Sequence, residues 1–414
     1  MNENILKSYE FAKKAYKAYG VDADAAIEKL KSIPLSVHCW QADDIAGFEK
    51  GEAAPSQNVV TGNYPGKARN GDEVRADLLK AFNGVTKFKV NLHSIYAEPK
   101  TKKERADVNA GDFDKWIKFA KENGFGLDFN GSFFAHNKMS RGLSLSSNIK
   151  SERDYWVKHA IGCREISNEM GKALGQVCVH NIWVPDGLKD APASRSYFRQ
   201  ILKDSLDEIL AKKYDRKNMT DVLECKLFSI GVESYTVGSA EFYYSYAMKN
   251  KTGLCIDNGH FSPEDDVADK LSALSLFTDD ILLHLTRHVR WDSDHVVIYN
   301  DELVSIMQEI KRNNLFNKVH IGLDYFDASI NRILAYTVGI RSAQKAMLYS
   351  LLEPTHLIEK AEREHDYSAR LLLSEEFKNL PFNAVYDYIC EVNNLKRGEE
   401  LLKDIRKYES ENKR

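Results

Sequence analysis

Apolar residues along this chain gather into short runs that alternate with stretches of helical spacing. The runs are nearly continuous in apolar character, as in Ile281-Leu282-Leu283. Such runs are typical of parallel strands that are covered on their outer face. They predict eight strands, at Ser36–Trp40, Lys87–Ser94, Gly126–Phe134, Gln176–Val184, Val222–Ile230, Gly253–Asp257, Ile281–Thr286 and Val319–Asp324.

The stretches between these runs place apolar residues three or four positions apart. Val74, Leu78 and Phe82 follow this spacing, which puts them on one side of a helix. A strand followed by a helix, eight times over, predicts an α/β fold, the (β/α)8 TIM barrel. Helices are predicted at Asp72–Phe82, Asp112–Glu122, Glu152–Leu174 and Leu202–Leu210.

Helical segments extend the predicted barrel at both ends. An N-terminal helical segment covers Met1 to Tyr19, the barrel closes near Asp327, and a helix over 328–352 follows. We therefore predict a catalytic barrel domain at residues 1–341. Residues 342–414 are predicted to form a C-terminal helical extension that makes subunit contacts, because it has too few apolar residues for a core of its own.

One connection is unusually long for a strand-to-helix loop. Lys50–Asp72 follows the first predicted strand and is rich in Gly, Pro and Asn. Long loops at the active face of a barrel often close over the substrate, so we favour a lid over a disordered surface excursion. The sequence leaves open whether such a lid covers its own active site or that of a neighbouring subunit.

Composition and charge narrow the function classes. The chain has 414 residues and a net charge of -3, which gives no basic field for nucleic acid or for an anionic membrane. Its apolar runs are all short of a membrane span, and its N-terminal segment lacks the apolar core of a secretory signal. The six cysteines form no CxxC pair, so neither a disulfide framework nor a thiolate zinc site is expected. A cytoplasmic location fits best.

Carboxylates and imidazoles follow the fifth to eighth predicted strands, which is where barrels carry their functional groups. Such side chains are costly beside apolar strands unless a cation uses them. Oxygen donors with some nitrogen suit Mn²⁺, with Co²⁺ or Mg²⁺ as alternatives, and seven ligands exceed what one ion needs. The sequence therefore predicts two divalent ions. The candidate ligands are Glu224, Asp257, His260, His284, Asp292, Asp294 and Asp324.

Local spacing strengthens some of these candidates and leaves others weak. Glu224 and Lys226 are two positions apart in an extended run, so they point to one side, either into a site or as a surface ion pair. The Asn258-Gly259 turn can bring His260 back beside Asp257. Asp292-Ser293-Asp294 alone fits a turn or helix cap equally well.

Seven longer motifs are distributed along nearly the whole chain. They are Gly62–Arg69, Asn91-Leu92-His93, Val222–Gly231, Ser234–Gly238, Asp257–His260, Val289–His295 and Ile321–Arg332. Together they resemble the motifs of the L-rhamnose isomerase family. The Glu-x-Lys and Asp-x-x-His elements also resemble those of xylose isomerase, a related family of metal-dependent barrels.

This resemblance implies a homotetramer that interconverts L-rhamnose and L-rhamnulose by a hydride shift from C2 to C1. A hydroxide on the second ion, oriented by Asp292 or Asp294, would take the O2 proton, and Lys226 would stabilise charge on O1. The implied ligands are Glu224, Asp257, His284 and Asp324 for one ion, and His260, Asp292 and Asp294 for the other, with Asp257 a candidate shared ligand.

Three further side chains end predicted strands and have two interpretations each. His93 either assists ring opening at O5 or O1, or is a core histidine. Trp40 and Trp183 either wall the pyranose face and the C6 methyl group, or pack the barrel.

Other functions remain open at this point. An isomerase with relaxed specificity for other aldoses fits the same residues. A barrel endonuclease acting on abasic DNA would need a positive groove, which the net charge disfavours. A non-catalytic sugar-binding barrel would need neither Lys226 nor two sets of ligands.

Overall fold

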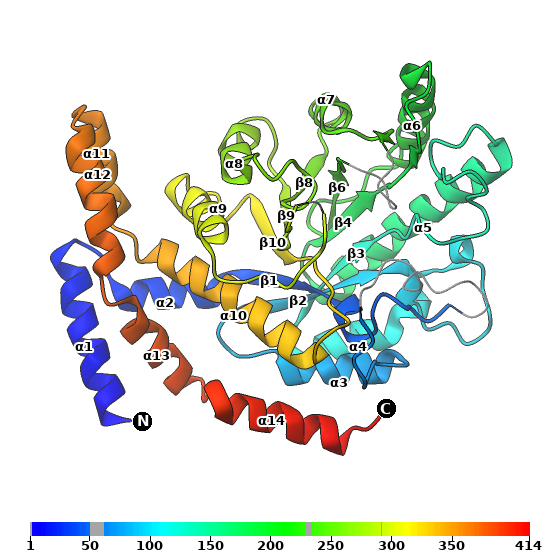
Figure 1. The fold of residues 1–414 in the computed structure, drawn as a ribbon. Helices are drawn as coiled ribbons and strands as arrows, with labels where there is room; N and C mark the ends of the chain where they lie inside the picture. The colour runs from blue at the N-terminus through cyan, green and yellow to red at the C-terminus, as the bar shows by residue number, and fades with distance from the viewer. Residues whose placement is uncertain (1, 50–61, 228–233, 291) are drawn as a thin grey trace.

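A closed barrel of eight parallel strands lies at the centre of the molecule, as predicted (Figure 1). The computed structural model describes residues 2–49, 62–227, 234–290 and 292–414. Around the barrel the strand order is β1-β10-β9-β8-β6-β4-β3-β2. The strands are β1 Pro34–His38, β2 Lys87–His93, β3 Gly126–Asn130, β4 Cys178–Trp183, β6 Met219–Glu224, β8 Gly253–Asp257, β9 Ile281–Leu285 and β10 Val319–Leu323.

Only Gly253–Asp257 has the limits that were predicted, and the other seven strands differ, most of them by one to four residues at an end. The first and fifth strands show why. The first ends at His38 because Cys39–Ala42 turns into a 3-10 helix, η1. The fifth begins earlier than predicted, at Met219, because the polar Asp221 belongs to it and is satisfied by an ion pair with Arg164 on the outer face. The last residues of the predicted fifth strand, 228–230, lie outside the described residues.

Helices cover the outer face of the barrel, and α9 illustrates why they form where they do. The side chain of Asn300 accepts from the backbone N–H of Leu303 and begins the helix, and apolar residues at helical spacing are buried against the strands. The covering helices are α3 Gly71–Ala81, α4 Asp114–Asn123, α5 Lys150–Leu174, α6 Arg195–Ile209, α7 Ala240–Asn250, α8 Val267–Ser275, α9 Asp301–Arg312 and α10 Arg332–Leu351. A small antiparallel pair, β5 Gly187–Leu188 and β7 Tyr235–Thr236, lies beside them.

Alternation along the strands determines which side chains reach the mouth of the barrel. Inside it, a small apolar cluster is fully buried, formed by Val179, Val222, Cys255 and Leu282. Successive side chains point to opposite faces of a strand, so the residue two positions further on points inward as well, and closer to the C-terminal end. Those residues are Asn181, Glu224, Asp257 and His284. The apolar cluster is thus the floor beneath the polar mouth.

The segment that follows β10 is hydrogen-bonded to the segment that follows β1. After β10, the backbone N–H and carbonyl of Asp327 are both hydrogen-bonded to the side chain of Gln41, at 2.7 and 3.0 Å. Arg332 forms a buried bidentate ion pair with Asp44, at 2.8 and 2.7 Å. The hydroxyl of Tyr336 donates to the carbonyls of His38 and Cys39. These contacts reinforce the pairing of β10 with β1.

The predicted lid is only partly within the described residues. Residues 50–61 lie outside them, so closure of this loop over a substrate stays a prediction. Its second half is held in place, because Arg332 donates to the carbonyls of Tyr64 and Pro65, and the N–H of Ala68 donates to Ala42.

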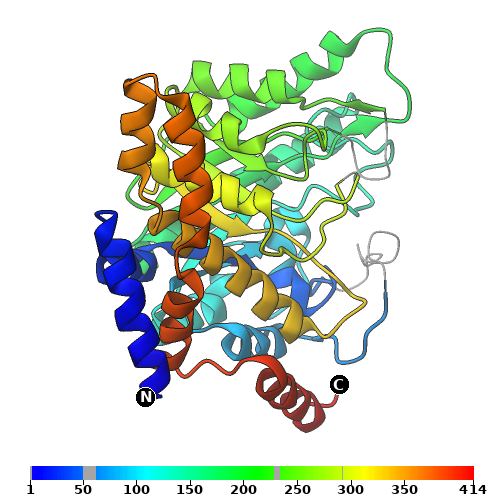
Figure 2. The same ribbon diagram turned by 60° about the vertical axis from the view of Figure 1, so that its left-hand side comes forward.

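Helices before and after the barrel pack against it and against each other. In both ribbon views α1 and α13 lie side by side, and the rings of Tyr9 and Tyr388 stack at 3.8 Å (Figures 1 and 2). The last helix reaches α3, where Tyr408 and Arg414 bind Asp77. These helices are α1 Glu3–Ala18, α2 Ala23–Ser32, α11 Thr355–Arg363, α12 Tyr367–Glu376, α13 Phe382–Val392 and α14 Gly398–Glu411.

The predicted domain limit falls within a helix. Helix α10 continues through residues 341 and 342, so the division of the chain there stays a prediction. All six cysteines are buried free thiols in the described part of the chain. Among the described helices, none is both long and apolar enough to cross a bilayer.

Candidate metal centre

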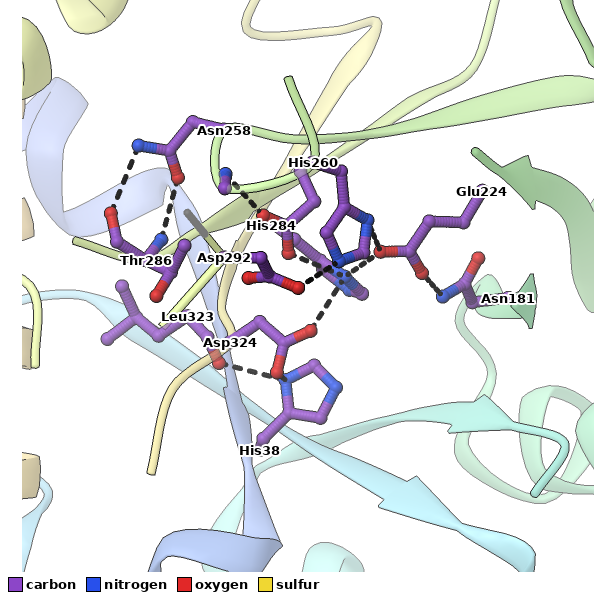
Figure 3. Close-up of polar contacts among 12 residues, drawn as sticks. His38, Asn181, Glu224, Asn258, His260, His284, Thr286, Asp292, Leu323 and Asp324 are labelled. Carbon is purple, nitrogen blue, oxygen red and sulfur yellow. Dashed lines mark hydrogen bonds and ion pairs between the residues drawn. The ribbon is translucent and has the colours of Figure 1, made fainter. Parts of the chain in front are cut away.

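Four buried ligand residues converge at the C-terminal ends of β6, β8, β9 and β10. Glu224, Asp257, His284 and Asp324 each offer a donor atom, and these atoms all lie within 4.8 Å of one another. His284 is central, with Nδ1 3.4 Å from Glu224 Oε1 and 3.1 Å from Asp324 Oδ2 (Figure 3). The structure therefore brings together the residues that the sequence assigned to the first ion.

A second group adjoins the first and shares Asp257 with it. Donor atoms of Asp257, His260 and Asp292 also lie within 4.8 Å of one another. The carbonyl of Cys225 accepts from Nδ1 of His260 at 2.9 Å, which leaves Nε2 available for a cation. That nitrogen is 3.2 Å from Asp292 Oδ2. Lys226 completes the group, because its ammonium pairs with Asp292 and lies 3.3 Å from His260 Nε2.

The turn after β8 is built for close approach. The side-chain amide of Asn258 donates to the carbonyl of Thr286 at 3.0 Å and accepts from its N–H at 2.7 Å. These two hydrogen bonds join the ends of β8 and β9. A Cβ atom on Gly259 would lie only 2.8 Å from Asp292 Oδ1. A side chain at position 259 would therefore displace the Asp292 carboxylate. The turn brings His260 back beside Asp257, as the spacing predicted.

Asp294 does not join either ligand group among the described residues. Its backbone has φ of 46°, a left-handed conformation that alternation along a strand does not anticipate. Burial and the neighbouring carboxylate of Asp292 raise the pKa of Asp294 well above its usual value, so its side chain is near the cluster. Its role as a ligand stays a prediction.

The opposite half of the barrel mouth is aromatic. The ring of His93 stacks on Trp40 at 4.4 Å, and Trp183 lies 5.7 Å from Phe134. The ammonium of Lys226 is 5.3 Å from the Trp183 ring. The three sequence candidates from this half therefore lie at the mouth, facing the ligand groups.

The candidate ligands and Lys226 have strongly shifted pKa values. Burial raises the pKa of Asp257 to about 8, against the attraction of His260 and with repulsion from nearby carboxylates. Burial would also raise the pKa of Glu224, but His284 and His260 hold it well below its usual range. Burial would lower the pKa of Lys226, and Asp292 and Asp294 raise it instead. The cluster thus carries closely spaced charges that a cation would balance.

Unpaired donor atoms fit a divalent cation. Within the described residues, Asp257 Oδ2, Asp292 Oδ1, Asp324 Oδ1 and both ring nitrogens of His284 are buried without a hydrogen-bond partner. Buried polar atoms are normally paired, so a concentration of unpaired ones at one place indicates a ligand. Mostly oxygen with some imidazole nitrogen suits a hard or borderline ion such as Mn²⁺, Co²⁺ or Mg²⁺.

Sequence reasoning missed two neutral residues of the mouth. Asn181 donates its amide to Glu224, and His38 donates from Nδ1 to the carbonyl of Leu323 at 2.8 Å (Figure 3). A useful signal was present, because Asn181 and His38 are each two positions before a tryptophan that ends a predicted strand, Trp183 and Trp40. Alternation along the strand would have put them there too.

Comparison with known proteins bears on what this centre does. A family model described as L-rhamnose isomerase (RhaA) matches residues 3–413. The chain belongs to the L-rhamnose isomerase family. It is 49% identical to the L-rhamnose isomerase of Mannheimia succiniciproducens, over 98% of this chain and 97% of that protein. It is 46% identical to that of Rhodopirellula baltica, over 99% of this chain and 96% of the relative. A solved L-ribulose 3-epimerase is similar with a TM-score of 0.48 and 12% identity, over 81% of this chain and 97% of that one.

Membership in the L-rhamnose isomerase family confirms the resemblance that the motifs indicated. The family model matches the chain from the first helix to the last, so it includes the C-terminal helices as well as the barrel. The chain is therefore an isomerase, and the endonuclease and sugar-binding alternatives are set aside.

Binding of Mn²⁺ to the metal-free protein is expected to release protons at pH 7. The pKa of Asp257 is about 8, and those of His260 and His284 are well above their usual value because nearby carboxylates outweigh burial. At pH 7 these groups are protonated, and a cation must displace the protons. Calorimetry in two buffers of different protonation enthalpy measures the number released. A binding enthalpy that is the same in both buffers would contradict the prediction.

Proposed function

We propose that this chain interconverts L-rhamnose and L-rhamnulose at the C-terminal mouth of its barrel, using two divalent cations. The observation that carries the proposal is the pair of adjoining ligand groups that share Asp257, with Lys226 beside them and an aromatic wall opposite. Family membership supplies the sugar and the reaction.

Two sets of residues would hold the cations. Glu224, Asp257, His284 and Asp324 would hold one, and His260, Asp292 and Asp294 the other, with Asp257 available to both. Bound there, divalent cations supply Lewis-acid polarisation of O1 and O2 of the open-chain sugar. Mn²⁺ is our first choice from the donor types, followed by Co²⁺ and Mg²⁺.

The remaining side chains control charge and protons. An aldose becomes a ketose when O2 loses a proton, a hydride moves from C2 to C1 and O1 gains a proton. Lys226, held by Asp292, would stabilise the negative charge that grows on O1. Asp292 and Asp294 would direct the proton that leaves O2. His93 would assist ring opening, since both of its ring nitrogens are buried without a partner among the described residues.

The aromatic half of the mouth would bind the less polar side of the sugar. Trp40 and Trp183 present ring faces there, and L-rhamnose has a methyl group at C6 where most hexoses have a hydroxyl. One methyl or hydroxyl changes binding by only about 1–3 kcal/mol in an apolar pocket, so related aldoses should also react, more slowly.

An assay of ketose formation with and without Mn²⁺ tests the proposal. We expect L-rhamnose to give the highest kcat/KM in a panel of aldoses that includes L-mannose. A higher value for another aldose would favour the relaxed-specificity alternative. Failure to isomerise any aldose with metal present would refute the proposed function.

We further propose that the chain assembles into a homotetramer through its C-terminal helices. On α12, Tyr367, Leu371 and Leu372 are about 60% exposed, which is unusual for adjacent large apolar side chains. A second copy of the chain would cover such a patch, in keeping with the subunit contacts predicted for this extension.

Replacing both Leu371 and Leu372 with Asp is expected to lower the mass that light scattering measures. Charges in an apolar interface lose their hydration without gaining partners, so association weakens. Leu79→Asp, at a 45% exposed position on α3 beside the buried Leu78, is the matched control and should leave the mass unchanged. A double variant that keeps the wild-type mass would contradict the role of α12.

A further inference from the structure

His38 has a ring whose two nitrogens have different roles. It ends β1 and is only 1% exposed. Nδ1 lies 2.8 Å from the carbonyl oxygen of Leu323. A carbonyl can only accept, so Nδ1 must carry the hydrogen. Nε2 of the neutral ring is therefore left as an acceptor.

The ring lies between the metal ligands and the aromatic wall. It stacks on Trp40 at 4.6 Å, meets His284 edge-on at 4.9 Å, and has its centroid 5.6 Å from that of His93. Figure 3 shows Nδ1 turned toward Leu323 and Asp324, and the other ring nitrogen turned away from them. Nε2 is buried and has no hydrogen-bond partner among the described residues.

The geometry argues against His38 as a metal ligand, although it lies beside His284 and Asp324. The nitrogen nearer to Asp324 is Nδ1, 3.6 Å from Oδ1. That nitrogen carries the hydrogen that Leu323 accepts, so its lone pair is not available to a cation between the two residues. A partner for His38 must instead come to Nε2, which is turned away from Asp324 and whose lone pair can accept a hydrogen bond from a hydroxyl.

We propose that Nε2 of His38 accepts a hydrogen bond from one sugar hydroxyl at C3, C4 or C5. This inference rests on the proposed function, in which O1 and O2 belong to the cations. His38 would then be a specificity residue. It accepts from a hydroxyl but offers nothing to an ether or a methylene. Because Leu323 precedes Asp324, the ring would also connect that hydroxyl to the strand end that carries a metal ligand.

The test combines one substitution with substrates that lack single hydroxyls. Asn in place of His38 can still donate to the Leu323 carbonyl but has no acceptor at the position of Nε2. We would measure kcat/KM with Mn²⁺ for L-rhamnose and for its 3-deoxy, 4-deoxy and 5-deoxy analogues. We expect His38→Asn to lower kcat/KM about 10- to 100-fold for L-rhamnose and for two analogues. The analogue that lacks the partner hydroxyl should be turned over equally by both enzymes.

His180 provides a matched control on the other face of the barrel wall. It is also 1% exposed, and its Nδ1 also has an acceptor, Asp221, at 2.9 Å. Its neighbour Asn181 points inward, so His180 points outward. His180→Asn should change kcat/KM by the same factor for all four sugars. His38→Gln, which returns a carbonyl acceptor to this region, should recover part of the lost selectivity.

Three results would overturn the inference. One is an equal loss for all four sugars in His38→Asn, and another is no loss for any. The third is loss of bound metal by elemental analysis, which would make His38 a support of the metal centre. If His38→Asn does not fold, His38→Gln takes its place, with a smaller loss expected for L-rhamnose and the two analogues that keep the partner hydroxyl, and none for the third analogue. A wild-type enzyme that does not isomerise L-rhamnose would instead refute the proposed function itself.

Discussion

Removing the divalent cations with EDTA is expected to abolish turnover of L-rhamnose, and Mn²⁺ or Co²⁺ to restore it. The buried cluster contains Glu224, Asp257, Asp292 and Asp324. Several of its carboxylate oxygens have no hydrogen-bond partner among the described residues. Without cations nothing polarises O1 and O2 of the sugar. Ketose formation measures the loss and the recovery.

The metal-free protein should remain folded, because backbone pairing joins β6 to β8, β8 to β9 and β9 to β10. Its melting temperature should rise when Mn²⁺ is added, since an ion that binds only the folded state stabilises it. Mg²⁺ is the informative comparison, because it keeps its own waters and prefers oxygen ligands. Full activity in a preparation shown by elemental analysis to be metal-free would contradict this prediction.

Asp292→Asn is expected to lower turnover by about 10²–10⁴-fold, the range typical of a lost proton-transfer or charge-stabilising group. The carboxylate of Asp292 pairs with Lys226 and lies 3.2 Å from His260 Nε2, so two functional side chains depend on it. Asn keeps the size of the side chain and removes its charge. Lys226 would then lack its partner, and the second cation would lose a ligand.

Glu224→Gln is the informative comparison, because Glu224 belongs to the other ligand group and accepts from Asn181. Glu224→Gln should lose metal more readily and melt at a lower temperature than the wild type. The side chain of Glu224 is more deeply buried than that of Asp292, and it contacts two histidines. Asp301→Asn, in the first turn of α9, should leave turnover unchanged. If Asp292→Asn retains near-normal turnover, or both variants melt alike with no dependence on Mn²⁺, the proposed division between the two groups is wrong.

The barrel could be predicted because parallel strands buried on both faces leave a simple signature. Each of the eight apolar runs became a strand, and the ligands lie at the strand ends because parallel strands all finish at the same rim. Family membership, which the motifs indicated, is confirmed over residues 3–413. The roles of the individual site residues stay predictions.

Residues that depend on distant partners could not be predicted in this way. His38 was not among the sequence candidates, because its hydrogen bond depends on β10, which brings the Leu323 carbonyl to it. Asp294 looked equivalent to Asp292, yet its left-handed backbone separates the two. Spacing along the chain reports which face of a strand a residue occupies, but it reports neither the partner across the barrel nor a local reversal of φ.

The contacts that join residues 327–336 to the end of β1 can form only late in the synthesis of the chain on the ribosome. Gln41, Asp44 and the backbone at His38 emerge early, but their partners Asp327, Arg332 and Tyr336 emerge only after the last strand. Until then β1 and β9 have open edges, which can pair with other chains. We therefore expect the nascent protein to acquire its metal only after β10 has been inserted, and a chain halted before residue 319 to be prone to aggregation.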